Sequence, residues 1–562
     1  MLVIALPARF PLRFLIALAL GALHAASFID DATWPIQIAA LAGLAALAAR
    51  AAREVQGSRG ARRAAIGGAR VGLAFGLGWF LTGVSWIYIS LHTYGEMNPL
   101  IAGAAILAFS AYLSIYPALA CAGFAWFRHA RSSDSQATHA ASVLIFAALW
   151  ALSEVGRGFV FTGFPWLAAG YAHMASPLAG YAPLIGVYGV SMVAAAIAAA
   201  LALSSRRIQR SRNGRNGRLR LVFMLSVVFG LPIAGSLLAR IDWTQPSGPP
   251  ISVRLLQGNV PLDVKFLDER FDGIADDYLK AIEAKRADLI VLPETAFPRL
   301  LAALPEAIGL RLAQDARTLN ADIAFGILNQ DGPDRYFNSV IAIGPTGRQG
   351  AAADAKGEPP TDADALAGIE AQRYDKSHLV PFGEFIPLGF HWFVRLMNMP
   401  LGDFTRGPLD QKPMTLAGNR VAFNICYEDL FGEEIIRQAG DANILVNISN
   451  VAWFGDSMAL PQHLDISRMR AIETGRPMLR ATNTGMTASI DPHGRVLAKL
   501  APFTVGSLDV AVQGMQGLTP YIRFGNTIVL LLIFVSIVGA LWVTRDIRVL
   551  RDGGGIGVID IR

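Results

Sequence analysis

The sequence predicts an integral membrane helical bundle joined to a polar α/β domain. The chain has 562 residues, of which 53% are hydrophobic and only 16% are charged, and its mean hydropathy is +0.41. A soluble protein carries about 25% charged residues. Eight apolar runs approach the roughly 20 residues that cross a bilayer core. Between the last two runs, residues 245–520 alternate strand-like and helix-like patterns, which is typical of an α/β domain.

Seven of the predicted spans precede the polar domain, and the eighth follows it. They lie at about 11–28, 34–49, 70–92, 99–127, 141–155, 178–203, 221–239 and 527–543. The first run leads into further apolar segments without a clear cleavage site, so we interpret it as a span and not as a signal peptide. The predicted divisions are a seven-helix bundle at 1–244, the polar domain at 245–520, and a final helix with its tail at 521–562.

Arginine placement predicts how the chain is oriented. Arginines gather in the links after the second, fourth and sixth spans and in the C-terminal tail. With eight spans, these four segments lie on one side, which the positive-inside rule makes cytoplasmic. Both termini are then cytoplasmic, and the polar domain faces the periplasm from a bacterial inner membrane. The same clustering accounts for the formal charge of +6, so no nucleic-acid partner is expected.

One outward link carries residues that two interpretations explain. Glu154 and Arg157 stand at the edge of the fifth span, and a Gly-Phe-Pro-Trp run ending at Trp166 follows them. Aromatic residues commonly anchor a chain at the membrane interface. Alternatively, ionisable residues near the membrane plane indicate a functional site, which here would bind a lipid headgroup.

The polar domain begins with regular alternation of strands and helices and ends with locally paired strands. Strands are predicted at 251–257, 288–294, 323–328, 337–343, 421–425, 443–448, 479–482 and 488–491, and helices at 268–286, 305–319 and 462–474. Residues 349–369 are predicted to be a surface insertion. The aromatic and Met-rich segment at 390–400 is either a core helix or a mobile apolar flap over the site.

Cys426 is the candidate around which the polar domain is organised. Of the two cysteines, Cys121 lies in a long apolar run, whereas Cys426 stands at the end of a predicted buried strand. A strand end fixes a side chain in space, as a covalent catalyst requires. A single cysteine is also often a small buried hydrophobic residue without reactivity, so Cys426 alone decides nothing.

Two further charged residues stand at similar ordered ends. Glu294 ends a predicted strand, and Lys376 follows Tyr374 and Asp375. A carboxylate can take the proton of a thiol as general base. A lysine can lower the thiol pKa and hold the oxyanion of a tetrahedral intermediate, together with the backbone N–H after the cysteine. The three positions are far apart in sequence, so only the fold can bring them together.

These residues resemble the Glu-Lys-Cys triad of the nitrilase (carbon-nitrogen hydrolase) superfamily. The matching motifs are Leu-Pro-Glu at 292–294, Tyr-Asp-Lys at 374–376 and Cys-Tyr-Glu at 426–428. The spans and the motifs at 162–166, 378–384, 452–455 and 481–485 are similar to those of the apolipoprotein N-acyltransferase family. This resemblance extends over essentially the whole chain. It implies a nitrilase-like αββα sandwich for the polar domain.

The resemblance also implies an activity and its partners. A phospholipid, typically phosphatidylethanolamine, would donate an acyl chain to Cys426 as a thioester. The free α-amine of the diacylglyceryl-cysteine of an apolipoprotein would then accept the chain. Glu294 would act as base and Lys376 would support the oxyanion. No cofactor and no metal are implied, and the partners are membrane lipid and lipoproteins.

Several more positions are carried over from the family motifs. Glu384 is expected to be an essential carboxylate beside Lys376, although it could be only a structural partner. Tyr427 and Glu428 are expected to line the acyl site, although Glu428 could only orient a loop. Further supporting or substrate-binding positions are Arg157, Trp166, Phe266, Asn450 and Trp453.

Two positions depart from the family pattern, and two other functions remain open. The family usually has Asp where this chain has Val451, and often Trp where it has Phe266. A membrane-anchored amidase or nitrile hydrolase could use the same triad, but one anchor would then suffice. A transporter with an accessory domain would show internal repeats or ionisable residues at mid-membrane, and neither is clear here.

Overall fold

The computed structural model describes two compact units of the chain. It covers residues 10–55, 60–131, 136–208, 215–345, 372–387, 389 and 404–545. One unit comprises Met1–Ser85, Ala104–Ile241 and Asn526–Arg562, and the other comprises Trp86–Gly103 and Asp242–Gly525. The predicted insertion at 349–369 and the segment predicted as a core helix or flap at 390–400 lie outside the described residues.

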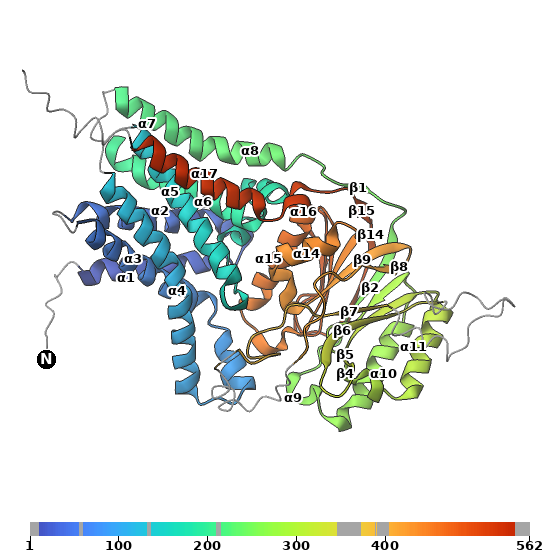
Figure 1. Ribbon diagram of the computed structural model, residues 1–562. Helices are drawn as coiled ribbons and strands as arrows, with labels where there is room; N and C mark the ends of the chain where they lie inside the picture. The colour runs from blue at the N-terminus through green and yellow to red at the C-terminus, as the bar shows by residue number, and fades with distance from the viewer. Residues whose placement is uncertain are drawn as a thin grey trace, which may run out of the picture. The chain divides into compact units, whose positions relative to one another are not determined.

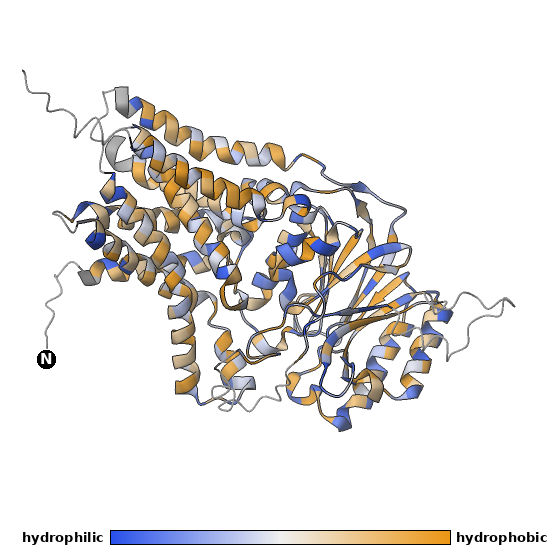
Figure 2. Ribbon diagram, in the orientation of Figure 1, coloured by the Kyte–Doolittle hydropathy of each residue, from blue (hydrophilic) through white to orange (hydrophobic). Residues whose placement is uncertain are grey.

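The first unit consists of apolar helices, which Figure 2 shows mostly in orange. These are α1 (Phe10–Ala26), α2 (Trp34–Arg53), α3 (Gly60–Gly83), most of α4 (Pro99–Ala130), α5 (Gln136–Phe159), α6 (Ala182–Ile208), α7 (Arg215–Leu225), α8 (Leu231–Leu238) and α17 (Thr527–Val543). Among the described residues, six helical stretches are long and apolar enough to cross a membrane, whereas α1 and α17 are apolar but shorter. The chain therefore has a membrane bundle, and the total of eight crossings stays a prediction.

Close packing of α1 against α3 depends on two glycines. A Cβ at Gly21 would overlap the backbone of Phe75, and one at Gly78 would overlap the backbone of Leu18. Small residues let two helix backbones approach each other where no hydrophobic effect drives them together. These positions explain why glycine interrupts otherwise strongly apolar helices.

The second unit contains two mixed sheets, and Figure 1 labels some of their strands. The first has the order β14 (Gly506–Val512), β2 (Ile251–Gln257), β3 (Leu289–Val291), β5 (Asp322–Gln330), β6 (Tyr336–Ile343), β7 (Arg373–Asp375), with β4 (Phe297–Leu300) paired to β5. The second has the order β13 (Val496–Lys499), β12 (Ala488–Ile490), β11 (Met478–Thr482), β10 (Ile444–Ser449), β9 (Asn419–Ile425), β8 (Met414–Leu416). A short pair, β1 (Gln245–Pro246) and β15 (Met515–Gln516), completes the strands described.

The two sheets pack face to face between helices. One core cluster joins buried residues of both sheets, including Val253, Val291, Phe423 and Val446. A second cluster lies between the first sheet and its covering helices, α10 (Asp268–Glu283) and α11 (Glu306–Leu319). A third lies between the second sheet and its covering helices, α14 (Gly432–Ala439) and α15 (Ala459–Thr474). This is an αββα sandwich, as predicted.

Strand direction decides where the chemistry can gather. β2, β3 and β5 run parallel to one another, and so do β9, β10 and β11. The residues that follow parallel strands therefore collect at one edge of each sheet. The eight predicted strands and three predicted helices are all present, whereas short strands such as β7 and β8 were not predicted because their sequences carry too little alternation.

Candidate active site

The three candidate residues stand directly after strands of the two sheets. Glu294 comes three residues after β3, Lys376 follows β7, and Cys426 follows β9. β7 and β3 belong to the first sheet and β9 to the second. All three residues are buried, with 7%, 1% and 9% of their surface exposed, respectively. The sandwich therefore gathers at one place groups that are far apart in the sequence.

Two hydrogen bonds and one longer ion pair hold the Glu294 carboxylate. The Asn338 side-chain amide donates to Oε1 at 2.7 Å, and the backbone N–H of Asn450 donates to Oε2 at 2.7 Å. The Nζ atom of Lys376 lies 3.7 Å from Oε1. Glu294 is thus oriented as an acceptor, which suits a general base.

The turn that carries Glu294 depends on a glycine in the neighbouring strand. Thr295 has a φ of +50°, a conformation that is uncommon for residues other than glycine. Gly326 in β5 lies so close that an added Cβ would be 2.7 Å from Cα of Glu294 and 2.6 Å from the Thr295 nitrogen. Any side chain at Gly326 would displace the carboxylate.

Lys376 lies between two carboxylates. Its Nζ is 2.9 Å from Oε1 of Glu384 and 3.7 Å from Oε1 of Glu294. Burial by itself lowers the pKa of Lys376, but the Glu384, Glu294 and Cys426 charges outweigh it, and the pKa lies above its ordinary value. The ammonium therefore stays charged at neutral pH. A buried fixed cation beside a thiol can stabilise a developing oxyanion.

Cys426 occupies a strained backbone position. Its φ is +52°, which places the side chain on a sharp turn between β9 and a 3-10 turn at Cys426–Leu430. Burial, followed by the Glu294 charge, raises the thiol pKa above its ordinary value, although Lys376 acts in the opposite direction. The expectation that lysine lowers this pKa is correct for its own contribution, but burial dominates. Cys426 is a thiol that needs a base.

Glu428 connects the cysteine turn to the lysine segment. Its Oε1 accepts the backbone N–H groups of Ser377 at 2.6 Å and His378 at 3.0 Å, and the Ser377 hydroxyl at 2.8 Å. Its Oε2 accepts the Ile425 N–H at 2.7 Å and the Tyr374 hydroxyl at 2.8 Å. Five donors from both sides of the site therefore meet on one carboxylate.

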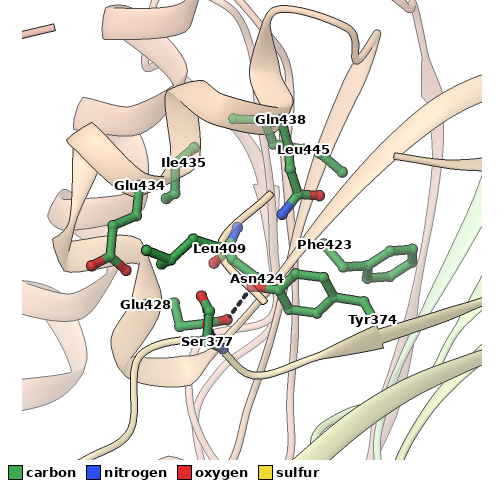
Figure 3. Close-up of a pocket in the computed structure, with 11 residues that line it drawn as sticks. Tyr374, Ser377, Leu409, Phe423, Asn424, Glu428, Glu434, Ile435, Gln438 and Leu445 are labelled. Atoms are coloured by element: carbon green, nitrogen blue, oxygen red, sulfur yellow. Dashed lines mark hydrogen bonds between the residues drawn. The ribbon is translucent and has the colours of Figure 1, made fainter. Parts of the chain in front are cut away.

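A small cavity of about 10 Å³ lies beside Glu428, and Figure 3 shows the side chains around it. Tyr374, Ser377, Glu434 and Gln438 supply polar groups to its wall, and none of the three candidate catalytic residues lines it. This volume is enough for about one water molecule. Glu428 and its hydrogen-bond partners Tyr374 and Ser377 line the cavity, which is too small for an acyl chain.

Comparison with known proteins assigns the family of this chain. Residues 252–521 match the carbon-nitrogen hydrolase model, and residues 20–200 match the model for the apolipoprotein N-acyltransferase N-terminal domain. An apolipoprotein N-acyltransferase of Ralstonia nicotianae is 50% identical over 521 residues, which span 92% of this chain and 91% of that protein. One of Nitrosomonas europaea is 43% identical over 532 residues, which span 93% and 95%, respectively. The chain belongs to the apolipoprotein N-acyltransferase family. It is an acyltransferase with a membrane bundle and a nitrilase-like domain.

The remaining candidates in the domain of this acyltransferase have different surroundings. Tyr427 is buried, with its ring centroid 5.3 Å from that of Phe431. The Trp453 carbonyl accepts the Ser90 hydroxyl at 2.7 Å. Phe266, where the family often has Trp, is 49% exposed. Contact of Tyr427, Trp453 or Phe266 with substrate stays a prediction.

Asn450 and Val451 lie together on the turn after β10. Asn450 binds Glu294 through its backbone and accepts a hydrogen bond at Oδ1 from Asn483 at 3.1 Å. Val451 is 2% exposed and packs against Gly485. An Asp at position 451 would be buried in the same place, and an altered hydrogen bond in this turn stays a prediction.

Two of the predicted positions belong to the membrane unit of this acyltransferase. Arg157 and Trp166 are each 1% exposed. The Arg157 guanidinium donates to the carbonyl of Trp166 at 2.6 Å and to that of Phe164, and Glu154 accepts the Ala169 N–H at 2.9 Å. Both charged residues therefore hold the backbone of the link between α5 and α6. Contact with a phospholipid headgroup stays a prediction.

Sequence patterns missed two polar residues that position the site. Asn338 lies on β6 and donates to both Glu294 at 2.7 Å and Glu384 at 3.0 Å. Lys265, 1% exposed, ends α9 (Leu262–Lys265), and its Nζ donates to the Glu294 carbonyl at 3.1 Å. A polar residue inside an apolar strand pattern was the available signal for Asn338. Nothing in the local sequence distinguishes Lys265 from a surface lysine.

Proposed function

We propose that this protein transfers a fatty acyl chain from a phospholipid to the α-amino group of the N-terminal S-diacylglyceryl-cysteine of apolipoproteins. The observation that carries the proposal is the convergence of the Glu294 carboxylate and the Lys376 ammonium beside the strained Cys426 turn. The names of the similar proteins support the lipoprotein acceptor. Phosphatidylethanolamine is the proposed donor.

The first half of the reaction loads the cysteine. Glu294 takes the proton from Cys426 while Sγ bonds to the ester carbonyl carbon, and the C=O electron pair moves onto oxygen. The Lys376 ammonium and the Tyr427 N–H stabilise this oxyanion. Collapse then breaks the bond to the glycerol oxygen, which takes the proton from Glu294. The products are a lysophospholipid and a thioester on Cys426.

The second half transfers the chain to nitrogen. The acceptor amine attacks the thioester carbonyl, and Glu294 takes a proton from the attacking nitrogen. The second tetrahedral intermediate collapses with loss of the Cys426 thiolate, which regains its proton from Glu294. Burial of Glu294, Lys376 and Cys426 keeps the thioester away from water, which favours aminolysis over hydrolysis.

The location proposed for this reaction follows from the arginine-rich links. The catalytic domain faces the periplasm from the bacterial inner membrane, and both termini are cytoplasmic. Donor and acceptor are then both lipids of the same membrane, so neither has to leave the bilayer to reach the enzyme. The apolar helices of the first unit support a membrane enzyme of this kind.

Intact-mass spectrometry of the purified full-length protein with phosphatidylethanolamine tests the function. We expect a mass gain of one acyl chain, which a diacylglyceryl-cysteine peptide discharges with acylation of that peptide. Cys426→Ala abolishes the adduct. Cys121→Ser is the matched control, because Cys121 is the second free cysteine and lies buried in α4, and this variant retains the adduct.

Two results would contradict the proposal. Loss of the adduct with water as the acceptor and no acylated peptide would indicate a hydrolase. Absence of any adduct on folded wild-type protein, or its presence on Cys426→Ala, would exclude Cys426 as the nucleophile.

A further inference from the structure

The backbone carbonyl of Cys426 is held by two buried side chains that the proposed reaction does not use. The Asn447 side-chain amide donates to this oxygen at 3.2 Å, and the His463 imidazole lies at 3.2 Å through Nε2. Asn447 is fully buried on β10, and His463 is 1% exposed on α15. Two elements of the second sheet layer therefore converge on one peptide group.

Arg480 determines which ring nitrogen of His463 carries hydrogen. Its Nη2 lies 3.1 Å from His463 Nδ1. A guanidinium has only donors, so Nδ1 accepts and Nε2 carries the hydrogen. Nε2–H then faces both the Cys426 carbonyl and Oδ1 of Asp429, which is 3.0 Å away. Asp429 is paired in turn with Arg480 at 3.0 Å. The network keeps the imidazole in its donating orientation.

Asn447 is oriented by a similar set of contacts. The Ser449 hydroxyl donates to its Oδ1, and its Nδ2 donates to Oδ1 of Asn424 as well as to the Cys426 carbonyl. The Asn447 oxygen faces a hydroxyl donor and its nitrogen faces two carbonyl acceptors, so only one orientation of the amide satisfies all three contacts. Both donors to the Cys426 carbonyl are thus fixed before any substrate binds.

Fixing this carbonyl also fixes the next N–H group. The Cys426–Tyr427 peptide bond is trans, so the Tyr427 N–H points opposite to the Cys426 C=O. We propose that His463 and Asn447 are positioning residues that aim the Tyr427 N–H at the oxyanion. This inference rests on the proposed function, in which that N–H stabilises the tetrahedral intermediate.

The backbone at Cys426 is strained, and the two contacts to its carbonyl help to maintain this conformation. At a φ of +52° a residue with a side chain is in a sparsely populated conformation, and such strain persists only where surrounding contacts enforce it. Without the donors, the Cys426–Tyr427 peptide plane can rotate and carry the N–H away from the oxyanion. A displacement of about 1 Å in a catalytic group can cost on the order of 100-fold in rate.

Two rates measured on the full-length protein distinguish a positioning role from a general disturbance of the site. Phosphatidylethanolamine is the substrate for the first rate, and iodoacetamide is the reagent for the second. The first is acyl-enzyme formation, which passes through an oxyanion. The second is alkylation of Cys426 by iodoacetamide, which displaces iodide at a saturated carbon and forms no oxyanion. For His463→Phe we expect acylation to fall on the order of 100-fold, with alkylation unchanged. His463→Gln, which keeps a donor near Nε2, restores part of the acylation rate.

Two further variants complete the design. Asn447→Leu removes the other donor, and we expect the same split between the two rates; it also serves if His463→Phe does not fold. Thr474→Val is the matched control, because Thr474 lies in the same helix as His463 and makes its buried hydrogen bond to the Arg470 carbonyl, not to the Cys426 carbonyl. Its two rates stay at the wild-type level.

The possible outcomes separate this inference from the proposed function. Equal loss of acylation and alkylation in the His463 and Asn447 variants would show a merely structural role and overturn the inference. Wild-type acylation by folded variants would overturn it as well. Failure of the wild-type protein to form any acyl-enzyme would instead reject the proposed function, and the inference with it.

Discussion

The ammonium of Lys376 forms its shorter ion pair, at 2.9 Å, with Glu384 and not with Glu294, which lies at 3.7 Å. Glu384 also accepts the Val380 N–H at 2.8 Å through its other oxygen. It therefore closes the chain segment after Lys376 into a loop around the ammonium. This arrangement leaves Glu294 with only the longer ion pair to Lys376, so the ammonium does not occupy the carboxylate that is proposed to take a proton.

Glu384→Gln tests whether Glu384 holds the Lys376 ammonium while Glu294 acts as the base. The amide keeps the shape of the side chain but removes the charge, so Lys376 is drawn towards Glu294 and occupies the proposed base. We expect acyl-enzyme formation to fall by about 10- to 100-fold, measured by quenched intact-mass spectrometry. Asp276→Asn is the control, because Asp276 pairs with Lys280 and Arg311 on exposed helix faces. A Glu384→Gln rate equal to the control would contradict this account.

Glu428→Gln is predicted to be damaging despite its small change in shape. All five partners of this carboxylate are donors, and an amide nitrogen would face at least one of them. A buried donor left without an acceptor costs about 1–3 kcal/mol. We expect a lower thermal midpoint and loss of both acylation and Cys426 alkylation, because both segments shift. Unchanged alkylation would show that Glu428 does not hold the cysteine turn.

The positions of Glu294 and Cys426 after strands were predictable from apolar runs, whereas β7, which precedes Lys376, was not predicted. The strand before Cys426 was predicted to end at 425, as β9 does, whereas the strand before Glu294 was predicted to extend to 294 and β3 ends at Val291. Parallel strands bring their ends to one sheet edge. The positioning residues were not predictable in the same way. Asn338 reaches Glu294 only because β6 pairs antiparallel with β5 in a particular register, and register is set by the whole sheet.

Burial is the second property that the sequence did not supply. A lysine next to a cysteine suggests a lowered thiol pKa, yet burial reverses the net direction at Cys426. Arg157 shows the same limit, because an arginine at the edge of a span could equally face lipid or, as found, bind backbone carbonyls inside the unit. Solvent exposure depends on contacts between distant segments, which local patterns do not record.

The raised pKa of Cys426 predicts how its alkylation depends on pH. Burial and then the Glu294 charge raise this pKa, and Lys376 opposes them, so thiol predominates at neutral pH. We expect the iodoacetamide rate to rise about tenfold per pH unit from about pH 7 to 9, measured in Cys121→Ser so that Cys426 is the sole thiol. Lys376→Met raises the pKa further and slows alkylation throughout. A plateau below pH 9 would contradict the raised pKa.

Lys265 predicts a pH dependence of stability. Burial lowers its pKa to about 8 from 10.5, although the Glu294 charge acts in the opposite direction. Between these values the unfolded chain binds more protons at Lys265 than the folded protein, so the free energy of unfolding rises with pH, by roughly 3 kcal/mol in all. In thermal melts, the stability of the wild-type protein should therefore increase relative to that of Lys265→Met as the pH rises through this window. Lys285→Met, at an exposed lysine, should run parallel to wild type, and parallel curves for Lys265→Met would refute the lowered pKa.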